Sequence, residues 1–143
     1  MTIDKRRAKR IPVDLPVAVY FYNTMEKTRI GTPLAGSIKD LSPLGVALTV
    51  ATILHNGKHL FYTCNDNPDI VLELAFELSV SPEIIIAVPA APVWFDRDLE
   101  SDEKQFNLGL EFLANSKSPE IKTLCREVCQ NETTLFSLWK KFF

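Results

Sequence analysis

Apolar side chains recur at every second position in successive short stretches of this chain, and turn-forming residues separate the stretches. Residues 11–22 show the pattern most clearly. This alternation is typical of β-strands, in which successive side chains point to opposite faces. Five further strand-like stretches lie at residues 34–38, 46–50, 69–80, 84–95 and 106–113. Six strands at such short spacing predict an all-β fold, a six-stranded antiparallel barrel.

Near residue 118 the spacing of apolar residues changes from every second position to every third or fourth. Ser118 suits an N-cap, Pro119 suits the first helical position, and Glu120 places an acid in the first turn. Apolar side chains then follow at helical spacings of three and four, at Ile121, Leu124, Cys125, Val128 and Cys129. We expect this C-terminal helix to cover one opening of the barrel. The expected organisation is a barrel over residues 11–114 and a helical segment over residues 115–143.

Prolines and glycines divide the predicted strands. Pro89 and Pro92 predict bends or bulges in the strand at 84–95. Pro12 and Pro16 predict that the first strand lies at an edge or begins late. Residues 51–69 are the least regular part, with Asn56-Gly57 indicating one turn and residues 65–68 a second.

Composition indicates a single soluble domain. The chain has 143 residues, 46% apolar and 24% charged, which is the balance of a globular fold. The longest nearly continuous apolar run, residues 84–95, is shorter than the ~20 residues of a membrane-spanning helix. Three cysteines do not form a disulfide framework, and no apolar stretch follows the N-terminal basic residues. We therefore expect a cytoplasmic protein without a transmembrane segment.

The net charge of −2 hides a strongly basic N-terminus. Residues 1–10 hold five basic side chains and one acidic one, a net of +4, and the remaining 133 residues hold 11 basic and 17 acidic ones, a net of −6. A protein that binds long nucleic acids usually spreads positive charge over a face. A flexible basic arm of ten residues on an acidic body instead favours one compact anionic ligand, and no long nucleic acid.

Two short motifs stand on either side of the first two predicted strands. The first is RxxxR, in the segment Arg6-Arg7-Ala8-Lys9-Arg10, and the second is DxSxxG, in Asp40-Leu41-Ser42-Pro43-Leu44-Gly45. The second motif also predicts a tight turn, because Asp and Ser bond nearby backbone and Gly45 permits a positive φ. Each motif alone is weak. The two motifs together, in this order and at this separation in a β-rich chain, are a much more specific signal than either motif alone.

With these motifs the chain resembles the PilZ domain family, bacterial receptors for cyclic di-GMP. The segments 11–17, 93–95 and 108–112 also look like the first strand and last hairpin of that family, so the resemblance covers roughly residues 5–114. The resemblance implies a PilZ-like barrel that binds the second messenger without catalysis. It also implies a downstream protein partner, for which the C-terminal helix is one candidate surface, and a homodimer is an alternative output.

The resemblance implies six ligand-binding residues: Arg6, Arg7, Arg10, Asp40, Ser42 and Gly45. A guanidinium matches phosphate oxygens, and also the O6 and N7 edge of guanine, in bidentate geometry. Arg6 and Arg10 would bind those groups with help from Arg7. Asp40 would accept hydrogen bonds from guanine or orient an arginine. Ser42 would offer its hydroxyl to phosphate or base, and Gly45 would let the backbone approach the ligand.

The sequence gives less support for other kinds of functional site, such as an enzyme active site or a metal site. Enzyme signatures such as GxSxG, the phosphate loop and GxGxxG are absent from the sequence. His55 and His59, Cys125 and Cys129, and the acidic stretch 96–103 lack the spacings of zinc or calcium sites. We therefore predict no enzyme, no catalytic residue, no metal and no cofactor, with cyclic di-GMP as the ligand. Trp94 is expected in the core or barrel wall, with stacking under a guanine as the alternative.

Two other functions stay open. One is a PilZ-like adaptor that binds proteins and no nucleotide. The other is a small barrel that binds single-stranded nucleic acid through its basic arm.

Overall fold

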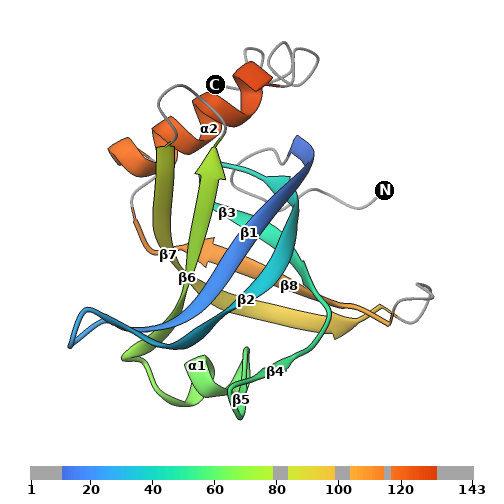
Figure 1. Ribbon diagram of the computed structural model, residues 1–143, viewed down its shortest axis with the longest axis vertical. Helices are drawn as coiled ribbons and strands as arrows, with labels where there is room; N and C mark the ends of the chain where they lie inside the picture. The colour runs from blue at the N-terminus through green and yellow to red at the C-terminus, as the bar shows by residue number, and fades with distance from the viewer. Residues whose placement is uncertain (1–10, 79–83, 99–103, 115–116, 132–143) are drawn as a thin grey trace, which may run out of the picture.

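Six long strands close into an antiparallel barrel, in the order β1-β2-β3-β8-β7-β6 with β6 paired to β1 (Figure 1). The computed structural model describes residues 11–78, 84–98, 104–114 and 117–131. The strands of the barrel are β1 (Ile11–Asn23), β2 (Thr28–Leu41), β3 (Gly45–Val50), β6 (Ile70–Leu78), β7 (Ile84–Arg97) and β8 (Phe106–Phe112). The predicted all-β barrel is confirmed.

The barrel interior is filled by alternate side chains of these strands. In β1 the buried side chains are Val17, Val19 and Phe21, which confirms the face predicted from the period of two. Their neighbours Ala18 and Tyr20 are only partly buried. Strand β3 follows the same pattern with Val46, Leu48 and Val50. This alternation separates the core face of these strands from their outer face.

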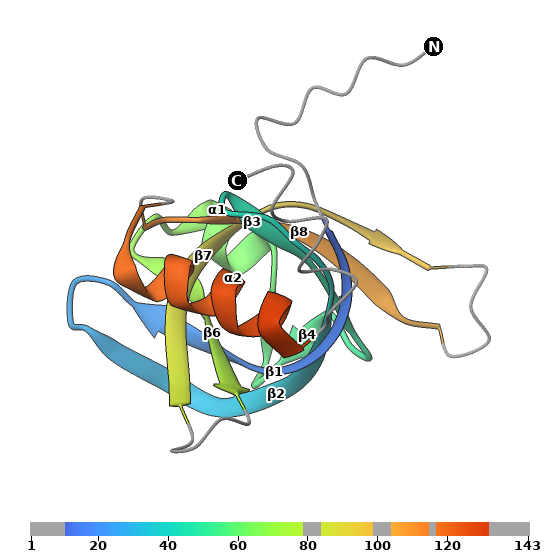
Figure 2. The ribbon, with the colours of Figure 1, turned by 90° about the horizontal axis from the view of Figure 1, so that it is seen from above.

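Helix α2 (Pro119–Asn131) lies across one end of the barrel (Figures 1 and 2). It begins where the sequence predicts, because the Ser118 Oγ accepts a hydrogen bond from the Ile121 N–H at 3.4 Å. Its apolar face joins the barrel core through Ile121, Leu124, Cys125 and Val128, all buried. The amphipathic spacing therefore correctly identifies a helix that covers an opening. Within the described residues, no helix is both long and apolar enough to cross a bilayer.

Strand β2 is much longer than the predicted stretch of 34–38. Gly31 and Pro33 are residue types that usually interrupt a strand, but β2 passes through both. Between the pairs Val19↔Leu34 and Phe21↔Ile30 the register shifts, and Gly31 adopts a φ of 76°. Breaker residues here make an irregularity within a strand rather than ending it.

Prolines in the barrel occupy positions that the pairing can accept. The first part of β1, which includes Pro16, pairs with β2, and pairing with β6 begins only at Ala18. In β7 the register shifts between Pro92 and Trp94, where Val93 is the extra residue. The edge-like start of β1 and the bulge next to Pro92 are thus confirmed. A bulge at Pro89 is not, because Pro89 pairs with Glu73 without a shift of register.

The irregular region 51–69 closes the barrel end opposite α2 (Figure 1). A two-residue turn joins β4 (Leu54–His55) to β5 (Lys58–His59), and Asn56 and Gly57 both have positive φ, as the sequence predicts for this turn type. Helix α1 (Tyr62–Asp66) follows and was not predicted. It has five residues, too few for the apolar periodicity that reveals a helix.

Candidate ligand-binding face

The DxSxxG segment forms a tight turn between β2 and β3, as predicted. Asp40 is half-buried near the end of β2. Ser42 is only 2% exposed, and its Oγ accepts hydrogen bonds from the backbone N–H groups of Leu44, at 3.1 Å, and Gly45, at 3.2 Å. The Ser42 N–H donates to the Gly45 carbonyl at 2.9 Å. The serine hydroxyl therefore holds the turn, a common role for a short polar side chain.

The positive φ predicted at Gly45 is wrong, because the described glycines with positive φ are Gly31 and Gly57. Gly45 instead starts β3 in an extended conformation opposite Glu111 of β8. A Cβ built on Gly45 would lie 2.1 Å from the Leu110 carbonyl oxygen and 3.2 Å from the Glu111 Cα. The glycine is required because two backbones approach closely there.

Strand β1 begins beside this turn. Ile11 is paired with Leu41, and Pro12 is paired with Asp40. Directly paired Cα atoms in antiparallel strands are about 4.5–5.5 Å apart. The chain therefore enters the barrel at the DxSxxG turn. Arg6, Arg7 and Arg10 precede this point in the sequence and lie outside the described residues, together with the rest of the predicted basic arm.

Two rows of paired residues cross the outer face of β2, β3, β8 and β7. One row, which starts at the motif, comprises Asp40, Ala47, Gly109 and Trp94. The parallel row comprises Ser37, Thr49, Asn107 and Asp96. Residues paired across strands share one face of a sheet. The motif turn is thus continuous with a surface that has small residues in its centre and polar residues along one side.

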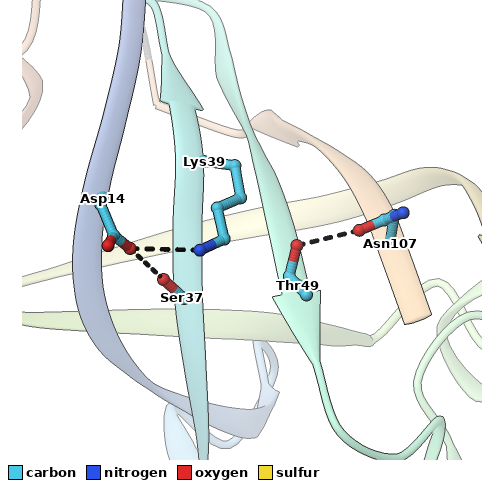
Figure 3. Close-up of polar contacts among 5 residues, drawn as sticks. All are labelled: Asp14, Ser37, Lys39, Thr49 and Asn107. Carbon is cyan, nitrogen blue, oxygen red and sulfur yellow. Dashed lines mark hydrogen bonds and ion pairs between the residues drawn. The ribbon is translucent and has the colours of Figure 1, made fainter. Parts of the chain in front are cut away.

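Hydrogen bonds connect the polar residues of this face (Figure 3). The Asp14 Oδ1 accepts from the Ser37 hydroxyl at 2.9 Å and from the Lys39 Nζ at 3.2 Å. The hydrogen bond from Ser37, followed by that from Lys39, lowers the pKa of Asp14 below its usual value. The Thr49 hydroxyl donates to the Asn107 Oδ1 at 2.9 Å. Hydrogen bonds therefore link polar side chains of neighbouring strands on this face.

Trp94 belongs to the barrel wall and points outward. Its side chain is 42% exposed, and its indole lies against Gly109, where an added Cβ would be 2.0 Å from Nε1. Even-numbered residues earlier in β7, such as Ile86 and Val88, face the core. The bulge at Val93 shifts this alternation by one residue, so that Phe95 packs against the core instead.

Comparisons with known proteins bear on the fold. No protein-family model matches the chain, and no curated protein matches it either. Among solved structures, the Bacillus subtilis inhibitor of motility MotI/DgrA superposes with a TM-score of 0.58 at 16% identity, over 92% of this chain. This chain spans about half of MotI/DgrA, 53% of its length. The PilZ domain of YcgR from Escherichia coli, solved with c-di-GMP, superposes with a TM-score of 0.52 at 12% identity, over 96% of both chains.

This chain has a PilZ-like fold. At these identities the similarity extends to the architecture of the PilZ-like domain, that is, the barrel and the C-terminal helix.

Both histidines of the PilZ-like domain form hydrogen bonds with backbone groups of the domain. The Nδ1 atom of His59 accepts hydrogen bonds from the backbone N–H groups of Phe61 and Tyr62, and burial lowers the pKa of this imidazole. The His55 Nε2 lies 2.7 Å from the Thr32 carbonyl oxygen. Among the described residues, no three His, Cys, Asp or Glu side chains are grouped to hold a metal ion; residues 99–103 of the acidic stretch are outside this set.

Replacing Ser42 with alanine is expected to lower the free energy of unfolding by about 1–3 kcal/mol, because the buried Gly45 N–H and the partly buried Leu44 N–H would lose their partner. Urea unfolding measures the loss. Ser37→Ala is the matched control, since its hydroxyl bonds an exposed carboxylate, and we expect a smaller effect. Equal losses in both variants would contradict the turn-holding role of Ser42.

Proposed function

We propose that this PilZ-like domain is a receptor for cyclic di-GMP that binds the ligand without catalysis. The observation that supports the proposal most is the register at the start of β1. Ile11 is paired with Leu41, and Pro12 is paired with Asp40. In the sequence, RxxxR ends at Arg10, directly before Ile11. Ile11, the residue that follows RxxxR in the sequence, is thus paired with Leu41 of the DxSxxG segment.

The chemistry of the two motifs matches the two kinds of group in the ligand. Arg6 and Arg10 would bind phosphate oxygens and the O6 and N7 edge of guanine through their planar guanidinium groups, with Arg7 as a further cation. Asp40 would accept from the N1–H and N2–H₂ groups of a guanine or orient an arginine. Ser42 and Gly45 support the site by shaping the turn, and a direct contact of the Ser42 hydroxyl with the ligand stays a prediction.

A receptor of this type would act in the bacterial cytoplasm and pass its signal on by a conformational change. The repulsion among the cations of residues 5–10 would be relieved when an anionic ligand binds, and this segment would become ordered against the barrel. We expect the amide protons of residues 5–10 to exchange more slowly in the complex. The ordered segment would then change the binding of a protein partner or of a second copy of the chain.

Calorimetric titration of the full chain with cyclic di-GMP, and separately with a single-stranded oligonucleotide, tests the proposal. We expect binding of cyclic di-GMP with a defined stoichiometry. Binding of the oligonucleotide alone, with a steep dependence on salt, would identify a nucleic-acid-binding barrel instead. Binding of neither would identify an adaptor that recognises proteins. Either of these results would overturn the proposal.

A further inference from the structure

His59 fixes the connection between β5 and α1, at the barrel end opposite α2 (Figure 1). Its Nδ1 atom accepts hydrogen bonds from the backbone N–H groups of Phe61, at 3.1 Å, and Tyr62, at 3.0 Å. N–H groups at the start of a helix have no partner within the helix and need another acceptor. The imidazole nitrogen supplies this acceptor for the start of α1.

Elsewhere in the chain, an oxygen atom accepts in the same pattern. The Oδ1 of Asn23 accepts from the N–H groups two and three residues further on, at 2.9 and 3.0 Å, and the Oγ of Ser42 does the same at 3.1 and 3.2 Å. An imidazole nitrogen accepts only while it lacks a hydrogen, because both nitrogens are donors in the charged ring. The turn that His59 holds is therefore sensitive to acid, whereas the other two turns are not.

Aromatic and apolar side chains pack against the ring of His59. Its centroid lies 4.4 Å from the ring centroid of Tyr62 on α1 and 5.0 Å from that of Phe95 on β7. Leu54 of β4 is its partner across the short hairpin. Burial among these groups lowers the pKa of the imidazole below its usual value. Of the three neighbours, only Tyr62 has a titratable group.

The charged residues next to these neighbours lie on other faces. Lys58 precedes His59 on β5, and Asp96 follows Phe95 on β7; successive side chains of a strand point to opposite faces. Asp66 lies at the far end of α1 and is exposed. A proton on the Nδ1 of His59 would therefore place a positive charge among aromatic rings rather than beside a carboxylate.

The second histidine of the chain provides a contrast within the same hairpin. The Nε2 of His55 lies 2.7 Å from the Thr32 carbonyl oxygen. A carbonyl oxygen can only accept, so this nitrogen carries a hydrogen both in the neutral ring and in the charged one. Protonation therefore leaves the hydrogen bond of His55 intact, whereas it removes both hydrogen bonds of His59.

We propose that His59 is an acid-sensitive switch that opens the barrel end opposite α2. When its Nδ1 binds a proton, the hydrogen bonds to Phe61 and Tyr62 are lost, and the segment of β5 and α1 separates from the barrel. This segment contributes Leu60 and Cys64 to the core, so its separation exposes apolar surface. The switch does not depend on the ligand proposed above.

The direction of the pH dependence follows from linkage. The pKa of His59 is lower in the closed barrel than in the opened one, so the opened form binds the proton first as the pH falls. The closed form retains its full stability above about pH 6.5, the usual pKa of histidine. Below that pH, the ratio of opened to closed chain rises by up to about tenfold per pH unit, until the pH reaches the pKa of the closed form.

The thiol of Cys64 reports the opening, because it is buried on α1 and burial raises its pKa to about 12. The full chain is labelled with dithiodipyridine, a thiol reagent that also reacts in acid, and peptide mass spectrometry identifies the labelled cysteine. Each rate is divided by the rate for the chain unfolded in urea at the same pH, which gives the protection of the thiol. We expect the protection of Cys64 to fall by up to about tenfold per pH unit below about pH 6.5.

Three variants assign the effect to His59. His59→Asn supplies an oxygen acceptor that suits the same turn and is not protonated in this range, so the protection of Cys64 should no longer depend on pH. His59→Ala removes the acceptor, and we expect low protection at every pH. His55→Gln is the matched control: it removes the other imidazole, keeps a donor for the Thr32 carbonyl, and should retain the pH dependence.

Several outcomes would overturn the switch. One is protection of Cys64 that stays constant as the pH falls, and another is an unchanged pH dependence in His59→Asn. An equal loss of protection at Cys125, which is buried on α2, would show that the whole domain unfolds rather than one end. Nitrogen-15 NMR should find the hydrogen of neutral His59 on Nε2, and a hydrogen on Nδ1 would contradict the proposal. If His59→Ala does not fold, His59→Asn and His55→Gln still decide the question.

Discussion

Alanine at Arg10 or at Arg6 is expected to weaken the binding of cyclic di-GMP by about 1.5–3 kcal/mol, the scale of a hydrogen bond to a charged group. This corresponds to roughly 10- to 150-fold in the dissociation constant. The loss arises because a guanidinium presents two parallel N–H donors to a phosphate or to the O6 and N7 edge of guanine. Isothermal titration calorimetry measures the change in affinity for each variant.

Two further variants distinguish a specific contact from a general attraction. Lys9→Ala removes the same charge from the same segment without touching RxxxR, and we expect a much smaller loss. Arg10→Lys keeps the charge but lacks the planar fork, so most of the loss should persist. A fall in melting temperature with unchanged affinity in Arg10→Ala would contradict a ligand-binding role of Arg10. An equal loss of affinity in Lys9→Ala would contradict a specific contact of RxxxR with the ligand.

Gly45→Ala is expected to lower the free energy of unfolding by about 1–3 kcal/mol, near the upper end of that range. The new methyl group would lie 2.1 Å from the Leu110 carbonyl oxygen and 3.2 Å from the Glu111 Cα. Both are backbone atoms of β8, so no side-chain rotation can relieve the clash. Thermal unfolding measures the effect as a decrease of roughly 2–4 °C per kcal/mol in a chain near this length.

A glycine elsewhere in the barrel provides the control for Gly45. Gly57 lies in the β4–β5 turn, has a φ of 75°, and has no atom within 4 Å of an added Cβ. Asparagine tolerates that backbone conformation better than other side chains do, so Gly57→Asn should cost less stability than Gly45→Ala. Full stability of Gly45→Ala would show that β3 and β8 can separate without cost, and the close approach would then not explain this glycine.

The fold was more predictable than the boundaries of its strands. Alternation is strong in β1 and β3, where one face is wholly apolar, so both strands follow from the sequence. The extent of β2 does not, because Gly31 and Pro33 look locally like the end of a strand. Pairing with β1 on one side overrides that local preference, and a shift of register absorbs the irregular residues.

The candidate site was predicted only in part. DxSxxG correctly predicts a turn, since Ser42 forms its hydrogen bonds within four residues of chain. The reason for Gly45 could not be predicted, because it depends on Leu110 of β8, which is distant in sequence. The contributions of Arg6 and Arg10 stay predictions until ligand binding is measured.

The amino-acid sequence by itself determined what depends on short separations along the chain. These properties include the six strands, the start of α2 at Ser118 and the order of the two motifs, because periodicity, capping and motif spacing are local. The tertiary structure alone decided which residues share the outer face. A single bulge at Val93 reverses the direction of every later side chain in β7, and this reversal brings Trp94 and Asp96 to the same surface as Asp40.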